Sequence, residues 1–494
     1  MAEAKNTFIK SKMNKDLDDR LIPSGEYRDG QNIAVSRSED SDVGAVENIL
    51  GNKSITDFGL TSNIGIEVIG HYMDVPNEVI YLFLTNYGDT SISKLSNDAS
   101  ISGDVECHIV QYNIKANSHI TLISGSWLNF SKTHPISGVN LIEDLLFWTD
   151  NRNQPRKINV EIAAIPGNDA NSTNPYYTNE DHISVAKYYP FKCIDLYKKE
   201  TDTSSGNLHE YVSTMRDVVS EYLPIHTAQV IQGTVTNQNY LAIKENNYNI
   251  AVGSKVTGED IVGDCVVTGI APNIFSSGNT RVYFEAPQAV QTTTIDKIVY
   301  FQSPNPDYNQ HWPGDPRFLE DKFVRFSYRF KFDDGEYSLM APFTQIAFVP
   351  KQDGYFINTD LKHQEDDTYR STIVKFMENK INDITLIING AEDSEGTILF
   401  RDLFNKLKVT EIDILYKESD GVSVKVLDTI KKEEFEVESS GAFEYNYQSR
   451  KPWRTLPERE IVRAWDKVPI RALSQETSGN RVIYGNYIDR HTSP

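Results

Sequence analysis

Short strand-forming segments separated by turn residues dominate this sequence of 494 residues. Hydrophobic and polar residues alternate from Val324 to Phe332, which predicts a half-buried β-strand. Asp334-Gly335 predicts the hairpin turn that follows, and residues 336–340 predict the returning strand. Similar runs rich in β-branched and aromatic residues occur at 78–85, 282–285 and 410–416. We therefore expect a mainly β fold with few helices.

Three segments have helical character. Residues 207–223 place apolar side chains at helical spacing, Asn207 and Glu210 resemble a capping box, and Pro224 ends the run. This pattern predicts an amphipathic helix. Weaker patterns predict short helices over 368–380 and 397–407.

One motif indicates architecture. Residues 145–150, Leu-Leu-Phe-Trp-Thr-Asp, and the polar turn after them resemble the blade motif of YWTD-type β-propellers. In a blade, Phe147 and Trp148 would pack between adjacent sheets and Asp150 would tie the turn. Residues 83–94 could form an earlier blade, but the chain has no clean repeat, so an unrelated hairpin is the alternative.

Composition shifts suggest domain boundaries. Residues 165–180 are almost without apolar residues, and prolines cluster between 304 and 316. We expect a β-propeller-like domain plus a β-rich platform, with an inserted β-sandwich or barrel-like module. The expected divisions are 1–165 (docking segment and propeller-like domain), 166–224 (loop and amphipathic helix), 225–303 (inserted small β module) and 304–494 (β-rich domain with two short helices, continuing the propeller or platform).

The charge balance is acidic. Forty-nine basic and 70 acidic residues give a net charge of −21, so the chain as a whole would repel nucleic acid. The start of the chain has no apolar signal region, and no run approaches the roughly 18 apolar residues of a membrane span. Cys107, Cys193 and Cys265 have no paired spacing, which predicts buried free thiols in a reducing compartment.

No catalytic or metal motif is complete. His209-Glu210 begins like a zinc-protease helix, but position 213 is serine instead of the second histidine. Acidic pairs such as Asp333-Asp334 lack the alternating ligand pattern of a calcium loop, so we interpret them as solvated turns. We expect no enzymatic activity, no catalytic residues, no metal and no cofactor.

The N-terminal sequence resembles a family of phage tail proteins. Residues 14–29, 32–36 and 43–52 are similar to the opening of the nozzle or stabilization proteins of short-tailed phages, including the muzzle-type tail proteins of crAss-like phages. Residues 328–338 and 479–487 also fit this family. The resemblance covers roughly the first fifty residues well and the remainder in patches, and residues 225–303 match no block of the family.

This resemblance implies a structural virion protein. Such subunits form a ring, expected to be a hexamer, around the DNA channel below the portal. They retain the packaged genome and guide its ejection. The implied partners are portal and ring neck proteins, other tail or fibre proteins, and genomic DNA that passes without specific binding. The expected location is the virion tail, assembled in the host cytoplasm. The chain could also be one part of a longer or processed product.

The same block suggests which residues make contacts. Arg20, Glu26, Arg28 and Asp29 flank the turn at 23–25 and could pair with a neighbouring subunit, although an intramolecular edge strand is equally compatible. A carboxylate-lined channel would let DNA slide. The candidate lumen charges are Asp18, Asp19, Asp40, Glu365, Asp366 and Asp367.

A receptor- or glycan-binding tail protein, possibly with depolymerase activity, is the alternative. It would need a tryptophan-lined cleft, and hydrolysis would need two facing carboxylates. The candidate cleft residues are Trp127, Trp148, Trp312, Trp453 and Trp465.

Overall fold

The computed structural model separates the chain into two compact units. The first comprises residues 1–65 with 112–119, and the second comprises 66–111 with 120–494. The structure describes residues 7–35, 44–49, 51–52, 58, 60, 65–88, 105–201, 209–232, 240–244, 250–258, 261, 265–274, 279–284, 297–351, 378–393, 396–438, 441–462, 468–479 and 481–489.

The N-terminal unit is built from two small strand pairs. Strand β1 (Lys12–Met13) runs parallel to β2 (Glu26–Tyr27), and the short 3-10 helix η1 (Asp19–Leu21) lies between them in sequence. Strand β3 (Ile33–Val35) pairs antiparallel with β4 (Val46–Asn48).

Two sheets share the first core of the second unit. A four-stranded sheet has the order β5-β6-β7-β8, and a three-stranded sheet has the order β11-β10-β9. Phe83, Phe130 and Trp148 are fully or almost fully buried here, and the Phe83 and Trp148 rings lie 5.5 Å apart. The elements are β5 (Glu67–Asp74), β6 (Val79–Thr85), β7 (Cys107–Asn113), β8 (Ser118–Ser124), η2 (Ser126–Leu128), β9 (Gly138–Ile142), β10 (Leu145–Thr149), β11 (Arg156–Asn159), α1 (Val160–Ala164) and α2 (Glu180–Ile183).

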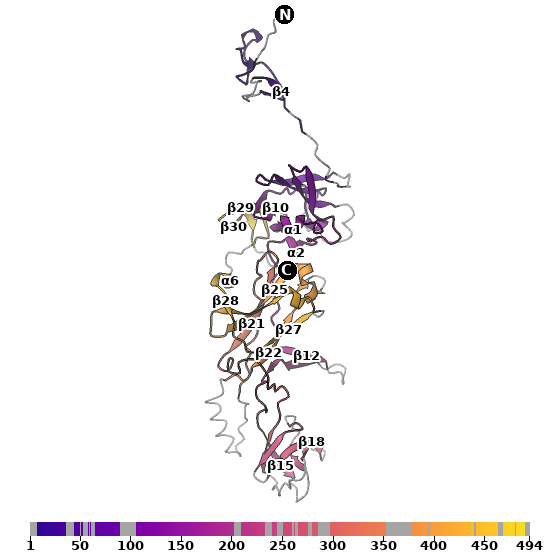
Figure 1. The fold of residues 1–494 in the computed structure, drawn as a ribbon, viewed down its shortest axis with the longest axis vertical. Coiled ribbons are helices and arrows are strands. Elements are labelled where there is room, and N and C mark those ends of the chain that lie inside the picture. Colours follow the sequence, from indigo (N-terminus) through magenta and orange to yellow (C-terminus); the bar gives the residue numbers. More distant parts are fainter. Residues whose placement is uncertain are drawn as a thin grey trace. The chain divides into compact units, whose positions relative to one another are not determined.

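A second core lies between two further sheets. One has the order β14-β22-β27, and the other has the order β21-β25-β26-β28 (Figure 1). Their facing side chains include Phe326, Tyr416 and Tyr447, whose rings contact one another. The elements are β14 (Met215–Arg216), β21 (Val324–Phe332), β22 (Asp383–Asn389), η3 (Phe400–Asp402), α4 (Leu403–Leu407), β25 (Val409–Glu418), β26 (Val424–Lys431), α5 (Lys432–Phe435), β27 (Ala442–Tyr447), β28 (Arg454–Thr455) and α6 (Glu458–Val462).

The hairpin expected after β21 is present but more buried than its pattern implied. Gly335 has φ of +79° at the turn, and the return segment donates backbone hydrogen bonds to β21, including Ser338 N to Phe330 O at 2.8 Å. Ser327 and Arg329, which the alternation placed in solvent, are buried. Ser327 donates to Ala341 O, and Arg329 pairs with Asp413 at 3.0 Å, so both polar side chains have partners inside the core.

A closed six-stranded barrel is inserted between β14 and β21. Its strand order is β15-β16-β19-β18-β17-β20, and β20 closes it by pairing with β15. Apolar side chains such as Val230, Leu241 and Phe301 fill its interior. The strands are β15 (His226–Gln232), β16 (Tyr240–Ile243), β17 (Lys255–Gly258), β18 (Cys265–Ile274), β19 (Asn279–Phe284) and β20 (Ile298–Gln302).

The two connections to the barrel are hydrogen-bonded to each other. Leu223 N donates to Ser303 O at 2.8 Å, and Asn305 N donates to Glu221 O at 3.0 Å. The chain therefore leaves and re-enters the second core at neighbouring positions, as expected for an inserted domain.

Three further hairpins complete the described strands. Strand β12 (Tyr197–Thr201) pairs with β13 (His209–Ser213), β23 (Glu392–Asp393) pairs with β24 (Gly396–Thr397), and β29 (Arg471–Ser478) pairs with β30 (Arg481–Ile488).

The mainly β class is therefore confirmed, and the inserted module includes a barrel. The propeller stays a prediction, although Trp148 packs between sheets as expected.

The helix expected over 207–223 is wrong, because residues 209–213 form β13. Pairing with β12 overrides the helical spacing of a segment that includes β-branched residues. The helix expected over 397–407 is present in part as η3 and α4. Most of 368–380 falls outside the described residues.

Two smaller expectations have mixed outcomes. Cys107 and Cys265 are buried and free, but Cys193 is exposed. Among the described residues, no helix is long and apolar enough to cross a membrane.

We expect the barrel to be dispensable for folding of the remainder. A variant in which an Asn-Gly turn replaces residues 224–302 should keep a cooperative thermal transition, because the barrel has its own core and its ends are already paired. Circular dichroism and calorimetry would measure this. A control that deletes β22, whose Ile384, Leu386 and Ile388 are buried, should not fold; equal loss of folding in both variants would contradict the prediction.

Candidate functional site

The predicted docking block, here the described residues from 7 to 49, forms a small structure held by hydrogen bonds within the block. Backbone hydrogen bonds join Lys10 N to Gly25 O at 3.1 Å and Asn14 N to Tyr27 O at 2.9 Å. The Asn14 side chain donates to Glu26 at 2.8 Å, and this bond lowers the pKa of the Glu26 carboxyl.

The four predicted interface charges all have partners within this block. Arg28 pairs with Asp19 and donates to Leu17 O. Lys15 lies 3.0 Å from Asp29 and lowers the pKa of that carboxyl through a hydrogen bond and its charge. Arg20 lies 3.8 Å from Asp18, and Lys10 lies 3.6 Å from Glu26. These charges fix the local fold, and their role at an interface stays a prediction.

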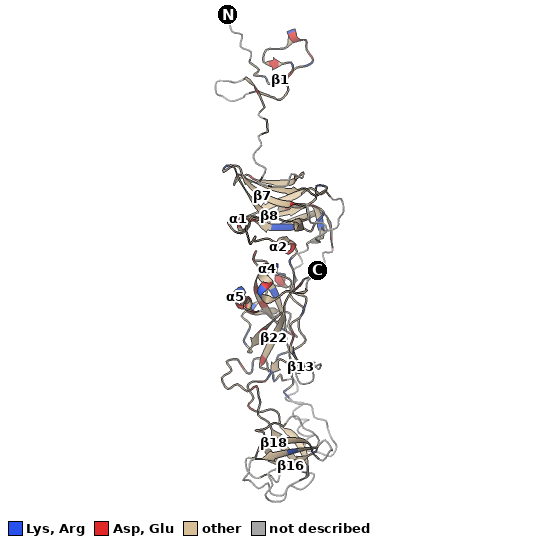
Figure 2. Cartoon of the chain, turned by 90° about the vertical axis from the view of Figure 1, so that its right-hand side faces the viewer, with Lys and Arg blue, Asp and Glu red and all other residues tan. Residues whose placement is uncertain are grey.

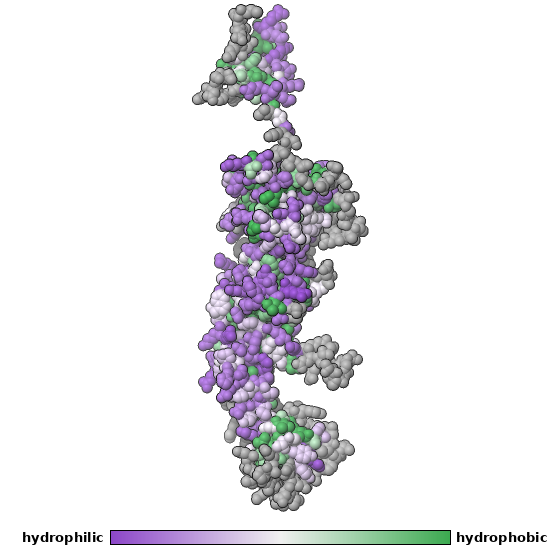
Figure 3. Space-filling model, turned by 45° about the vertical axis from the view of Figure 1, so that its right-hand side comes forward, coloured by the Kyte–Doolittle hydropathy of each residue, from purple (hydrophilic) through white to green (hydrophobic). Residues whose placement is uncertain are grey.

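Apolar exposure is the unusual property of this block. Among the described residues from 7 to 49, only Gly44 is buried. The side chains of Ile9, Leu21 and Ile49 are 64%, 67% and 57% exposed, and Figure 3 shows apolar surface on this unit beside hydrophilic surface. A segment of this size without a core normally needs a disulfide, a metal or a partner.

Two of the six candidate lumen charges can be placed. The side chains of Asp18 and Asp19 are 63% and 74% exposed at the start of η1, where Asp18 accepts a hydrogen bond from Arg20 N. Asp40, Glu365, Asp366 and Asp367 lie outside the described residues.

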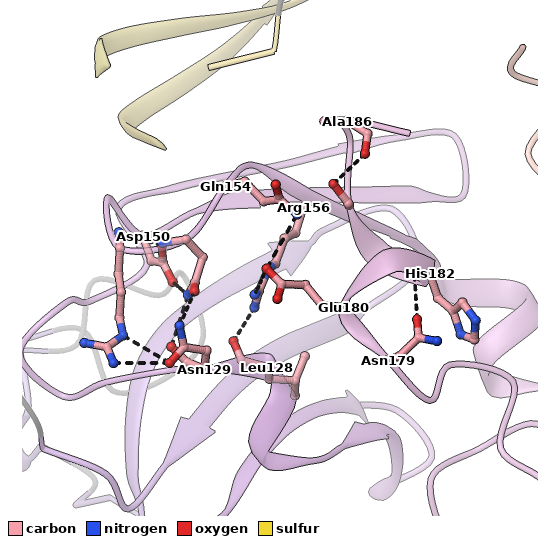
Figure 4. Close-up of polar contacts among 12 residues, drawn as sticks. Leu128, Asn129, Asp150, Gln154, Arg156, Asn179, Glu180, His182 and Ala186 are labelled. Atoms are coloured by element: carbon pink, nitrogen blue, oxygen red, sulfur yellow. Dashed lines mark hydrogen bonds and ion pairs between the residues drawn. The ribbon is translucent and has the colours of Figure 1, made fainter. Parts of the chain in front are cut away.

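Asp150 ties the turn after β10, as its motif predicted. Its carboxylate accepts hydrogen bonds from Arg152 N at 2.9 Å and Asn153 N at 2.7 Å, and the Asn153 side chain donates to the other oxygen at 2.5 Å (Figure 4). Asn129 reaches the same turn through a 2.6 Å hydrogen bond to Asn153. The turn is therefore buried and polar, with its donors and acceptors matched.

Arg156, in the strand that follows that turn, joins three elements. Its side chain is fully buried, donates to Leu128 O, and lies 3.1 Å from Glu180 at the start of α2 (Figure 4). A guanidinium without these acceptors would be costly in this position, so the contact fixes β11 against η2 and α2.

His182 has both ring nitrogens engaged. Thr178 N donates to Nδ1 at 3.2 Å, and Nε2 lies 3.0 Å from Lys406 O, so the neutral ring protonated at Nε2 satisfies both contacts. Burial, assisted by the charge of Lys408, lowers the pKa of His182 to about 3.

The strongest charge cluster joins the first core to the β21 hairpin. Asp334 lies 2.8 Å from Lys187 and 3.1 Å from Lys157, and Lys157 also lies 2.7 Å from Glu336. The side chains of both lysines are 3–9% exposed and that of Asp334 is 10% exposed. Burial opposes ionisation of Asp334, but the two lysines outweigh it and lower its pKa to about 2.

Tyr176 and Lys408 extend the cluster. Tyr176 donates to Asp333, and the Lys408 ammonium lies 4.1 Å from the Tyr176 ring centroid. Burial lowers the pKa of Lys408 to about 8. The interpretation of Asp333-Asp334 as a solvated turn is therefore wrong, because tertiary contacts bring Lys157 and Lys187 onto it.

Little in the sequence indicates this cluster. Lys157 and Lys187 lie far from Asp334 along the chain, and each looks like a surface residue by itself. The motif at 145–150 and its polar turn precede Lys157 in the sequence, but they carried no indication that this lysine, in β11, is buried.

The described residues contain no group of three histidine, cysteine or acidic side chains able to hold a metal. The described tryptophans form no shared cleft. Trp148 is in the first core and Trp127 packs against that core, whereas the Trp312 side chain lies 3.3 Å from Asp383 and Trp453 is 64% exposed beside Arg454. Trp465 lies outside the described residues. The ion pairs of the Asp334 cluster join segments that are far apart in the sequence. Charged residues also surround α4 and α5, near the same junction (Figure 2).

Comparison with known families identifies the N-terminal portion. Residues 2–183 match the family described as Crassvirus muzzle protein, which confirms the expected similarity to crAss-like muzzle proteins. No curated protein matches the chain. The matched range contains the docking block, the Asp150 turn, Arg156 and Lys157.

We expect acid to destabilise the fold through His182. The folded-state pKa lies below the ordinary value of 6.5, so between pH 6.5 and 3 the unfolded chain binds the additional proton and stability falls as pH falls. The contribution approaches about 1.4 kcal/mol per pH unit. His182→Gln should remove it in denaturant titrations at several pH values. The exposed His71→Gln variant is the control; an identical pH slope in all three proteins would contradict the prediction.

Loss of Asp334 should be costly at neutral pH. Asp334→Asn leaves Lys157 and Lys187 without their shared carboxylate, so the free energy of unfolding should fall by about 3 kcal/mol. The depressed pKa means that the native stabilisation is present above pH 3.8 and disappears as pH falls through 2, so the difference from wild type should shrink there. Asp420→Asn, in an exposed turn, should cost little, and equal losses in the two variants would refute the assignment.

Proposed function

We propose that this chain is a non-enzymatic subunit of a phage tail, forming a homo-oligomeric ring below the portal through which DNA passes. The observation that carries the proposal is the muzzle-family match over residues 2–183. That family supports a structural virion protein. The ring, the hexameric number, retention of the genome and contacts with neck or fibre proteins are proposals, as is a propeller built from the β5–β11 sheets.

The N-terminal unit supports an assembly role. Its charges are satisfied within the unit, whereas Ile9, Leu21 and Ile49 remain exposed. The attraction to a neighbouring subunit or neck protein would therefore come from apolar side chains, and the charged residues would set the shape that presents them. This refines the predicted docking role of Arg20, Glu26, Arg28 and Asp29.

The acidic charge supports unhindered DNA passage. With a net charge of −21, a channel built from copies of this chain would repel phosphate wherever carboxylates face it. The exposed Asp18 and Asp19 are compatible with this role. The glycan-binding alternative has no comparable support, because the described tryptophans are dispersed.

The native mass of the purified chain, alone and with portal-type neck proteins, tests the ring. We expect a defined ring, formed alone or on the neck, whose lumen carries Asp18, Asp19, Asp40 and residues 365–367 when imaged. A persistent monomer or trimer that ignores the neck and binds polysaccharide would refute the ring. A neutral or basic lumen would refute only the channel-charge proposal.

The docking surface predicts a selective assembly defect. Leu21→Asp should weaken ring or neck assembly roughly 10- to 100-fold, the loss of about 1.5–3 kcal/mol of apolar burial. Its thermal unfolding as a monomer should match wild type because Leu21 is 67% exposed. Val422→Asp makes the same change at a site 89% exposed in the second unit and should assemble normally; equal defects in both variants would contradict the prediction.

A further inference from the structure

The C-terminal hairpin β29–β30 is a separate two-stranded sheet that packs beside another sheet. Asn151 N donates to Ala472 O at 3.0 Å, Ser137 donates its hydroxyl to Leu473 O, and the Gln475 side chain donates to Asn140 at 3.1 Å. These contacts seat β29 beside β9, at the edge of the β11-β10-β9 sheet.

The surface of β9 that β29 contacts, called the seat below, has room for β29 only because position 138 is a glycine. A Cβ atom at Gly138 would lie 2.8 Å from both the backbone nitrogen and Cγ of Gln475, so any larger residue would push the strand away. Ala472 is fully buried in the contact. The rest of the contact is largely polar, made by hydroxyl, amide and backbone groups.

Several apolar side chains of the hairpin are exposed. Leu473, Ile483 and Ile488 are 40%, 54% and 46% exposed, and Tyr487 is 55% exposed. Among the described strands, β30 pairs only with β29, so its outer edge lies outside any larger sheet. A two-stranded hairpin is marginal by itself, so its order depends on the seat at β9.

The tether is long enough for the hairpin to reach another copy. Eight residues, 463–470, separate the end of α6 from the start of β29 and can span about 28 Å at 3.5 Å per residue. A contact made by a tethered element in its own chain is available, unchanged, on every identical chain. The hairpin is also one of the blocks, 479–487, that resembles phage nozzle proteins.

We propose that the hairpin at 468–489 is exchanged between neighbouring copies, so that β29 of one subunit seats on β9 of the next. This rests on the proposed ring, because a ring holds each hairpin close to a neighbouring seat and raises its effective concentration. Exchange would repeat the contacts with Ser137, Asn140 and Asn151 while placing the exposed apolar side chains of the hairpin between two subunits.

Cysteine cross-linking tests the exchange in the assembled full-length protein. In a Cys193→Ser background, Ser137→Cys and Leu473→Cys would be carried on separate, differently tagged chains and co-expressed. Treatment with a short bis-maleimide should give a covalent heterodimer. Val422→Cys in place of Leu473→Cys controls for random collision and should give none. The double variant Ser137→Cys/Leu473→Cys should give a ladder of covalent oligomers.

The outcomes separate the two proposals. A ring by native mass whose double variant gives only internally linked monomers would overturn exchange and leave the ring standing. Absence of a ring, with internal linkage alone, would overturn both. A heterodimer and ladder in a protein of ring mass would support exchange, and Gly138→Val should then weaken the ring while Gly421→Val, at a remote turn, should not.

Discussion

The ion pairs of Asp334 with Lys157 and Lys187 are the buried charged centre of the contact between two parts of the chain that are far apart in sequence. The two lysines come from the sheet-and-helix region before residue 188, and Asp334 comes from the turn of the β21 hairpin. Because these charges are largely buried, removal of Asp334 would leave Lys187 without its carboxylate partner and Lys157 with Glu336 alone. The contact is therefore strongly specific in geometry even if its net contribution to stability is modest.

The same design recurs on a smaller scale. Asp150 fixes a turn, Arg156 fixes α2 and η2 to β11, and His182 fixes α2 to the end of α4 through Lys406. Each contact uses one buried polar side chain whose hydrogen-bond or ion-pair partners are in place. The N-terminal unit differs: its four predicted interface charges pair locally, and apolar residues such as Ile9, Leu21 and Ile49 are exposed.

Local patterns predicted what depends on neighbouring residues. The β class, the Asp334-Gly335 turn, the position of Trp148 and the role of Asp150 all follow from alternation, turn chemistry or a short motif. Residues 209–213 were misjudged because strand pairing with 197–201 outweighs their helical spacing. Asp334, Ser327 and Arg329 were misjudged for a related reason: a polar side chain with distant partners looks solvent-exposed in sequence. The N-terminal docking charges and the lumen charges depend on neighbours that a single chain does not supply.

The hairpin at β29–β30 brings these arguments together. A strand seated by Ser137, Asn140 and Asn151 needs hydrogen-bond geometry more than apolar area, so it can be lodged on any copy that offers the same seat. On a neighbouring copy, the same polar contacts would resist displacement through hydrogen-bond geometry, whereas apolar docking resists it through buried area. If pressure from packaged DNA acts on the proposed ring, strand exchange at the second unit and apolar docking at the first would oppose it by different physical means. A condition that weakens the apolar docking contacts would therefore not weaken the hydrogen bonds of the exchanged strand.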